Sequence, residues 1–185
     1  MANTATNVSV GKPKTTGGIW RAPLGTTLPT DASTALAAAF VSLGYIANDG
    51  VTNSNTMESD EYKAWGGDVV LTYQTEKTDT FAFGLIESLN PDVLETVYGE
   101  DNVSGTLAAG ITVRANAADL TEYVYVIEQV LRGGVLKRIV IPDGKVSEIG
   151  EIVYQDEEVI NYQVTITAMA GADGDTHKEY IKAAA

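Results

Sequence analysis

Alternation of hydrophobic and polar positions dominates the chain and predicts β-strands. Residues 160–168 show it most clearly, and the same alternation predicts strands over 68–76 and 78–88. Residues 123–127 are apolar on both faces, which is typical of a strand that is covered on both sides. In the last strand the inward set is Ile160, Tyr162, Val164, Ile166 and Ala168, and the outward set is Asn161, Gln163, Thr165 and Thr167.

Turn-forming residues separate these strands. Asp143-Gly144 occupies the centre of residues 137–146 and predicts a hairpin, because this dipeptide suits the positive-φ positions of a tight turn. Residues 48–67 are polar and predict a long loop or a projecting hairpin, and residues 100–119 predict a loop. The polar face of the strand that follows residue 67 carries Asp68, Thr72, Gln74 and Glu76, opposite Val69, Leu71 and Tyr73.

Helical spacing occurs in two short segments. Leu36, Phe40 and Leu43 fall on one face of a predicted helix over 32–43, which Gly44 would end in a left-handed conformation. Asn90-Pro91 supplies a capping side chain and a proline at the first helical position, so a second short helix is expected to begin there and to end at Gly99.

Together these elements predict a mainly β fold, a β-sandwich or partly open barrel with one or two short flanking α-helices. The domain is expected over 17–170, including the 48–67 loop, between an N-terminal arm at 1–16 and a C-terminal arm at 171–185. The pattern gives no obvious cover for the sheet edges, which indicates that other subunits complete them.

Charge narrows the classes of function. The formal net charge is −13, and residues 49–101 hold twelve acidic residues against Lys63 and Lys77. Such a surface repels phosphates rather than binding them, which argues against a protein that grips nucleic acid. The plainer alternative is a soluble acidic surface with no special role. Cysteine is absent, which excludes disulfides and thiolate chemistry.

Catalytic patterns are scarce, so we expect no enzyme, no cofactor and no metal site. The only histidine, His177, lies in a polar arm, where a solvated surface residue is the favoured interpretation. Asp173-Gly174-Asp175 lacks the remaining ligands of a calcium loop and reads as a turn. Trp20 and Trp65 are interpreted as core residues, with a subunit interface as the alternative.

Several segments, taken in order, resemble the major tail tube proteins of long-tailed bacteriophages, siphophage type, especially of phages that infect actinobacteria. They are GIWRAPLGTTLPTDA at 18–32, LGYI at 43–46, DGV at 49–51, KAWGGDVV at 63–70, TFAF at 80–83, LNP at 89–91 and YG at 98–99. The match covers roughly residues 17–103, and the remainder is similar only in its strand pattern.

This resemblance implies hexameric rings, stacked into a tube, in which the sheets of neighbouring subunits merge around a lumen. DNA would pass through without specific binding. The implied partners are the chain itself, a tape measure protein and a tail terminator. The implied location is the virion tail, after synthesis in the host bacterial cytoplasm and without membrane insertion.

Two sets of residues are candidates for such surfaces. Lumen-facing candidates are Asp68, Thr72, Gln74, Glu76, Asn161, Gln163, Thr165 and Thr167, and subunit-interface candidates are Trp20, Glu58, Asp60, Glu61 and Trp65. The alternatives are a tube subunit of a contractile tail or injection machine, and a carbohydrate-binding β-sandwich module in which Trp20 and Trp65 stack on sugars.

Overall fold

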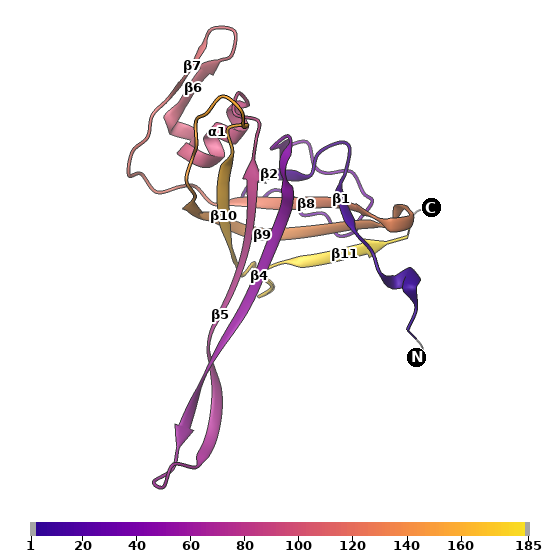
Figure 1. The fold of residues 1–185 in the computed structure, drawn as a ribbon, viewed down its shortest axis with the longest axis vertical. Helices are drawn as coiled ribbons and strands as arrows, with labels where there is room; N and C mark the ends of the chain where they lie inside the picture. The colour runs from indigo at the N-terminus through magenta and orange to yellow at the C-terminus, as the bar shows by residue number, and fades with distance from the viewer. Residues whose placement is uncertain (1–2, 184–185) are drawn as a thin grey trace.

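One curled β-sheet, with a helix packed at one end, makes up most of the molecule (Figure 1). The computed structural model describes residues 3–183, so the outer ends of the predicted arms, 1–2 and 184–185, lie outside the described residues. The strands are β1 (Gly11–Pro13), β2 (Ile19–Pro23), β3 (Val41–Ser42), β4 (Ile46–Lys63), β5 (Val69–Leu85), β6 (Val103–Thr106), β7 (Gly110–Val113), β8 (Tyr123–Leu131), β9 (Leu136–Ile149), β10 (Tyr162–Met169) and β11 (Lys178–Lys182). The helices are α1 (Pro91–Tyr98) and the 3-10 turns η1 (Ala5–Asn7), η2 (Glu100–Asn102) and η3 (Arg132–Gly134).

Within residues 3–183, nine strands form an antiparallel sheet whose main path is β3-β2-β8-β9-β10-β5-β4. β1 pairs with β8 and β11 with β9, so the sheet includes part of each predicted arm. In Figure 1, β8, β9 and β11 run across the view, whereas β4, β5 and β10 run along it. The sheet therefore folds over itself, and the predicted mainly β fold, a partly open barrel with a short flanking helix, is confirmed.

Two hydrophobic clusters lie on the two faces of β8. Tyr125 and Ile127 point into the larger cluster between the crossed halves of the sheet, together with Phe81 of β5 and residues of α1. Val124 and Val126 point into a smaller cluster that Phe40 covers. The prediction that this strand is covered on both sides is confirmed.

The predicted hairpin over 137–146 is wrong, because β9 runs without a break through Asp143-Gly144. The first half of β9 pairs with β11 and its second half with β10, and the strand turns a corner between them. A Cβ atom at Gly144 would lie 2.9 Å from Ile166 Cγ2 and 2.9 Å from Tyr125 Cδ2. Glycine is therefore required for close packing at the corner, not for a turn with positive φ.

Substituting Gly144 tests this explanation of the corner. Gly144→Ala is expected to lower the free energy of unfolding by about 1–3 kcal/mol, the usual cost of overpacking a core. Urea unfolding measures the change. Glu148→Ala, at an exposed position of the same strand, is the control and should change stability by less than about 0.5 kcal/mol. Equal effects of the two substitutions would contradict the packing explanation.

The predicted helix over 32–43 is also wrong. Asp31 does accept the backbone N–H groups of Ser33 and Thr34, as a helix cap would, but the chain bends instead of continuing as a helix. Since β3 pairs with β2, residues 24–40 leave the sheet and return to it, and Phe40 covers the smaller cluster on the way. A helix this short gains little without a long buried face, so tertiary packing overrides its sequence pattern.

The second predicted helix is confirmed as α1. Asn90 Oδ1 accepts the N–H of Asp92 at 3.0 Å, Pro91 takes the first position, and Gly99 follows the last turn. Residues 100–119, predicted as a loop, contain the small hairpin of β6 and β7 beside this helix.

Residues 48–67 supply one strand and the turn of a projecting hairpin. The second of the two predicted alternatives is therefore right about the projection, but its other strand, β5, follows residue 67. β4 and β5 extend together from the body to a turn at Ala64–Asp68. The strands predicted separately over 68–76 and 78–88 are one strand, because β5 continues from Val69 to Leu85. Backbone hydrogen bonds to β4 keep β5 extended through the polar residues that lie between the two predicted strands.

Candidate assembly surface

The β4–β5 hairpin extends beyond the body as a ribbon of two strands (Figure 1). Every residue from 52 to 77 is exposed, whereas Phe81 and Phe83 farther along β5 lie in the core. A two-stranded ribbon is marginally stable in water without a third strand or a packed face. A surface that covers this ribbon would therefore stabilise it.

Two irregularities in the pairing decide which side chains share a face of the hairpin. The register pairs Glu58 with Glu76, Asp60 with Tyr73, and Tyr62 with Leu71, and shifts lie between residues 58 and 59 and between 62 and 63. Directly opposed residues lie on one face, and alternate residues of β4 share that face. These six residues therefore form one face, which we call the hairpin face.

The two shifts place the lumen-facing candidates of β5 on different faces of the hairpin. Thr72 and Gln74 pair with Glu61 and Ser59 on the opposite face from Glu58 and Glu76, and Asp68 lies in the turn. A regular alternation along β5 would have placed Thr72, Gln74 and Glu76 together. Pairing shifts of this kind leave no simple signal in the sequence.

Exposed apolar side chains are concentrated on the hairpin. Tyr62 is 66% exposed, Leu71 57% and Tyr73 47%, and Trp65 at the tip is fully exposed. The interpretation of Trp65 as a core residue is therefore wrong. Trp20 is half-buried and packs against the smaller cluster. The concentration of uncovered apolar area on one projection is typical of a protein interface.

The outward side chains of β10 form part of a polar face on the body. Thr165 lies opposite Ala82 of β5, which lies opposite Thr52 of β4. In the next row, Thr167 lies opposite Thr80, and Gln163 continues the face beside Gly84. Asn161 precedes this strand, and its side chain lies over Gly84. The structure thus groups three of the four candidates from the last strand on one side of the sheet.

A buried carboxylate joins the hairpin base to the C-terminal segment. Asp79 of β5 is 1% exposed, and its oxygens accept from Asn53 Nδ2 at 2.8 Å, Thr176 Oγ1 at 2.7 Å and His177 Nδ1 at 2.5 Å. His177 also packs edge-on against Phe81, with ring centroids 5.2 Å apart. The interpretation of His177 as a solvated surface residue is therefore wrong, because its neighbours hold it against the barrel.

Opposing influences act on the Asp79 carboxyl. Burial, the largest one, raises its pKa, but the hydrogen bonds from Thr176, His177 and Asn53 and the nearby His177 charge together lower it. The net result is a pKa below the ordinary value, so Asp79 is ionised at neutral pH. Since a carboxylate only accepts hydrogen bonds, His177 Nδ1 carries the proton between the two residues.

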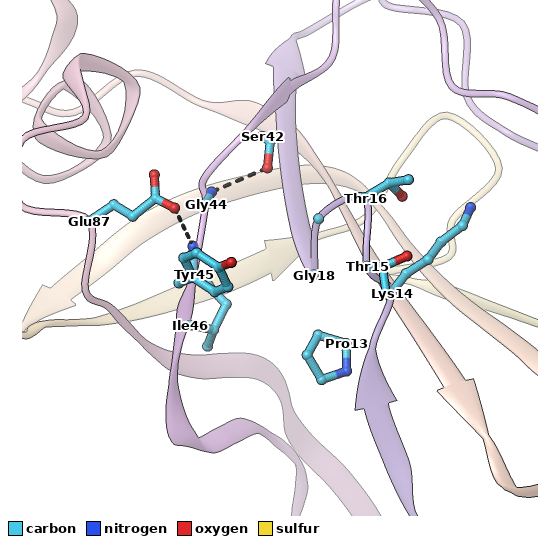
Figure 2. A pocket seen from close by; sticks show the side chains of 11 residues that line it. Pro13, Lys14, Thr15, Thr16, Gly18, Ser42, Gly44, Tyr45, Ile46 and Glu87 are labelled. Carbon is cyan, nitrogen blue, oxygen red and sulfur yellow. Dashed lines mark hydrogen bonds between the residues drawn. The ribbon is translucent and has the colours of Figure 1, made fainter.

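Figure 2 shows a cleft that lies between the β1–β2 connection and the start of β4 and has a volume of about 610 Å³. Its charged groups already hold the chain together. Glu87 accepts the backbone N–H of Tyr45 at 2.9 Å and the Asn90 side chain at 3.0 Å, and Lys14 pairs with Glu128 at 3.2 Å. The cleft is a gap between two margins of the sheet, and its lining residues hold no acid–base or nucleophile pair for chemistry.

Metal and membrane sites were also sought in the part of the chain that the structure describes. Among these residues no group of three histidine, cysteine or acidic side chains could hold a metal ion. Asp173-Gly174-Asp175 forms a turn, as predicted, with Gly174 at φ 86°. No described helix is long and apolar enough to cross a membrane.

Comparisons with known proteins show the family to which the chain belongs. A family model described as phage tail tube protein matches residues 1–185. Among solved structures, the chain is similar to the cap of an anti-feeding prophage, the AFP tube terminating cap, with a TM-score of 0.42, 11% identity and full coverage of both chains. No curated protein matches. The chain belongs to the phage tail tube protein family, a structural, non-enzymatic family whose members form part of the virion tail.

Proposed function

We propose that this chain self-assembles into stacked hexameric rings that form the tail tube of a long-tailed phage of the siphophage type, and that this tube conducts DNA into the host. The observation that carries the proposal is the uncovered β4–β5 hairpin, with Tyr62, Leu71, Tyr73 and Trp65 exposed beyond the body. An identical copy supplies the cover that a lone chain lacks. A tape measure protein inside the tube and a tail terminator at its end are the further partners.

The polar face of β10 is the proposed wall of the lumen. Gln163, Thr165 and Thr167 lie on this face with the neighbouring Thr80 and Thr52, and all five side chains are uncharged. Lys145 of β9, directly opposite Thr167, is already paired with Asp119 at 2.7 Å. The net charge of −13 per chain is repeated in every copy, and repulsion acts over a Debye length of about 8 Å at physiological salt. DNA would therefore slide along this wall without binding.

The hairpin residues are divided between the two proposed roles. Glu58, Asp60, Trp65 and Glu76 are assigned to contacts between subunits, because they lie on the hairpin face or at the tip. Figure 1 shows the two hairpin strands crossing below the body, so the ribbon is twisted. The other side of the ribbon carries Thr72 and Gln74, and its turn contains Asp68. These three residues stay candidates for the lumen. Asn161, beside Gln163, is a fourth candidate.

Purified protein is expected to polymerise into hollow tubes above a threshold concentration. Light scattering over a concentration series measures the threshold, and negative-stain electron microscopy shows whether the polymers are stacked rings with a central channel. Monomer at every concentration, even with preformed tubes added as seeds, would contradict the proposal. Saturable binding on a glycan array by such a monomer would instead support the carbohydrate-binding module.

A further inference from the structure

A row of basic residues stands out on this acidic protein. Lys12 on β1 pairs with Val130 on β8, Val130 with Leu136 on β9, and Leu136 with Lys182 on β11. Directly opposed residues share a face, so the four side chains form one line across four strands. Arg132 lies in the turn at the end of this line. We call these five residues the basic row.

The basic side chains of the basic row are accessible to a partner. Lys12, Arg132 and Lys182 are exposed. Among the residues that the structure describes, no carboxylate forms an ion pair with any of these three side chains, although Lys182 Nζ contacts Ser33 Oγ at 2.9 Å. The neighbouring acid Glu128 is buried and already neutralised by Arg138 at 2.5 Å and Lys14 at 3.2 Å. An approaching surface therefore meets cations flanking two half-buried apolar side chains.

The hairpin face has the complementary character. It carries Glu58, Asp60 and Glu76 beside the exposed Tyr62, Leu71 and Tyr73. Glu58 and Glu76 are directly opposed, and like charges in that position repel each other until a cation lies near them. The stretch from Glu58 to Tyr62 is about 14 Å long, and the basic row from Lys12 to Lys182 spans about 14 Å across three strand spacings.

We propose that the hairpin face of one copy binds the basic row of a second copy, and that this contact joins successive rings. The inference rests on the proposed function and adds the surface that receives the hairpin. Figure 1 places the hairpin at one end of the molecule, away from β1 and β11, which carry Lys12 and Lys182, so each copy offers two different surfaces. A contact between two different surfaces can repeat from copy to copy, and it gives an open polymer when the rotation between copies does not close into a ring.

Reciprocal charge reversal tests the contact. An acceptor variant carries Lys12→Glu and Lys182→Glu, and a hairpin variant carries Glu58→Lys and Glu76→Lys. Each alone should raise the threshold concentration for polymerisation at least tenfold. A 1:1 mixture should restore polymerisation. The acidic hairpin of the acceptor variant is complementary to the basic row of the hairpin variant. The basic hairpin of the hairpin variant is likewise complementary to the acidic row of the acceptor variant. Restoration also shows that both variants are folded.

The control variant, Arg114→Glu with Lys145→Glu, has the same change in net charge as the acceptor variant, but both changes lie outside the basic row. Arg114 follows β7, and Lys145 lies in the second half of β9, away from Leu136, so this variant should polymerise near the normal threshold. Thresholds unchanged in both reversed variants, or a mixture that fails to polymerise, would overturn the inference while leaving the tube intact. Failure of the unaltered chain to polymerise would reject the proposed function itself.

Duplex DNA is the competing occupant of a basic row. Fluorescence anisotropy with a labelled duplex, measured on the unaltered protein and the acceptor variant, addresses it. Absence of saturable binding is expected and supports the inference, since the net charge is −13. Saturable binding that the acceptor variant loses, together with normal polymerisation of that variant, would assign the row to nucleic acid and overturn the contact.

Discussion

Replacing Tyr62, Leu71 and Tyr73 by serine is expected to abolish polymerisation while leaving the chain folded. Burying a large apolar side chain contributes about 1.5–3 kcal/mol. Three such losses amount to about 5 kcal/mol or more, and every 1.4 kcal/mol changes an association constant tenfold. The threshold concentration should therefore rise more than about 100-fold, as measured by light scattering and electron microscopy.

Stability should change little in this triple variant. The three side chains are 66%, 57% and 47% exposed and contribute little to the core of the single chain. Substitutions at such positions usually change the free energy of unfolding by less than about 0.5 kcal/mol each. Circular dichroism and urea unfolding would separate loss of assembly from loss of folding.

A matched control removes similar apolar area elsewhere. Val153, Tyr154 and Val159, in the connection between β9 and β10, are also exposed, and their replacement by serine should leave the threshold near its normal value. Tubes formed by the hairpin variant at the usual concentration would show that the hairpin face is not the surface that joins copies.

Removing the Asp79 carboxylate is expected to cause the largest loss of stability. Asp79→Ala leaves His177, Thr176 and Asn53 without their shared acceptor. Breaking a buried pair by removing one partner usually costs about 3–5 kcal/mol. The free energy of unfolding in urea should fall by an amount of this order, and backbone amides of β11 should exchange hydrogen faster, because His177 directly precedes that strand.

The dependence of stability on pH gives a separate signature of Asp79. Its pKa is lowered in the folded protein, so its stabilising contribution is present above the unfolded value of about 3.9 and is lost as the pH falls through the lower, folded value. Stability of the unaltered chain should therefore decrease with acidification in this range, and Asp79→Asn should reduce the slope there. An unchanged slope in Asp79→Asn would show that this carboxyl is not the group responsible.

The local predictions that succeeded rest on interactions between residues that are near in sequence. The Asn90-Pro91 start of α1 follows from a side chain that accepts a nearby N–H and from a proline that suits the first turn. The alternation in β10 follows from the geometry of a strand with one buried face. The strand at residues 123–127, apolar on both faces, is covered on both sides.

The predictions that failed concern residues whose role depends on distant partners. Gly144 suits a turn in isolation, but Ile166 and Tyr125 pack against it at the corner of β9. His177 has polar neighbours in sequence, but Asp79 and Phe81 of β5 enclose it. The segment around Phe40 has helical spacing, but Phe40 packs against Val124 and Val126 on one face of β8. None of these partners is marked in the sequence around the residue itself.

By itself, the sequence determined the mainly β class, the capped helix, the acidic charge and the resemblance to tail tube proteins. Periodicity and capping are properties of short segments, and net charge depends only on the amino-acid composition of the chain. Only the tertiary structure decided which strands meet, where the register of the hairpin shifts, and that Lys12 and Lys182 lie on one line across four strands. The physical reason is that pairing between strands joins residues far apart along the chain. A shift of a single residue moves a side chain to the other face, while the alternation along each strand stays almost the same.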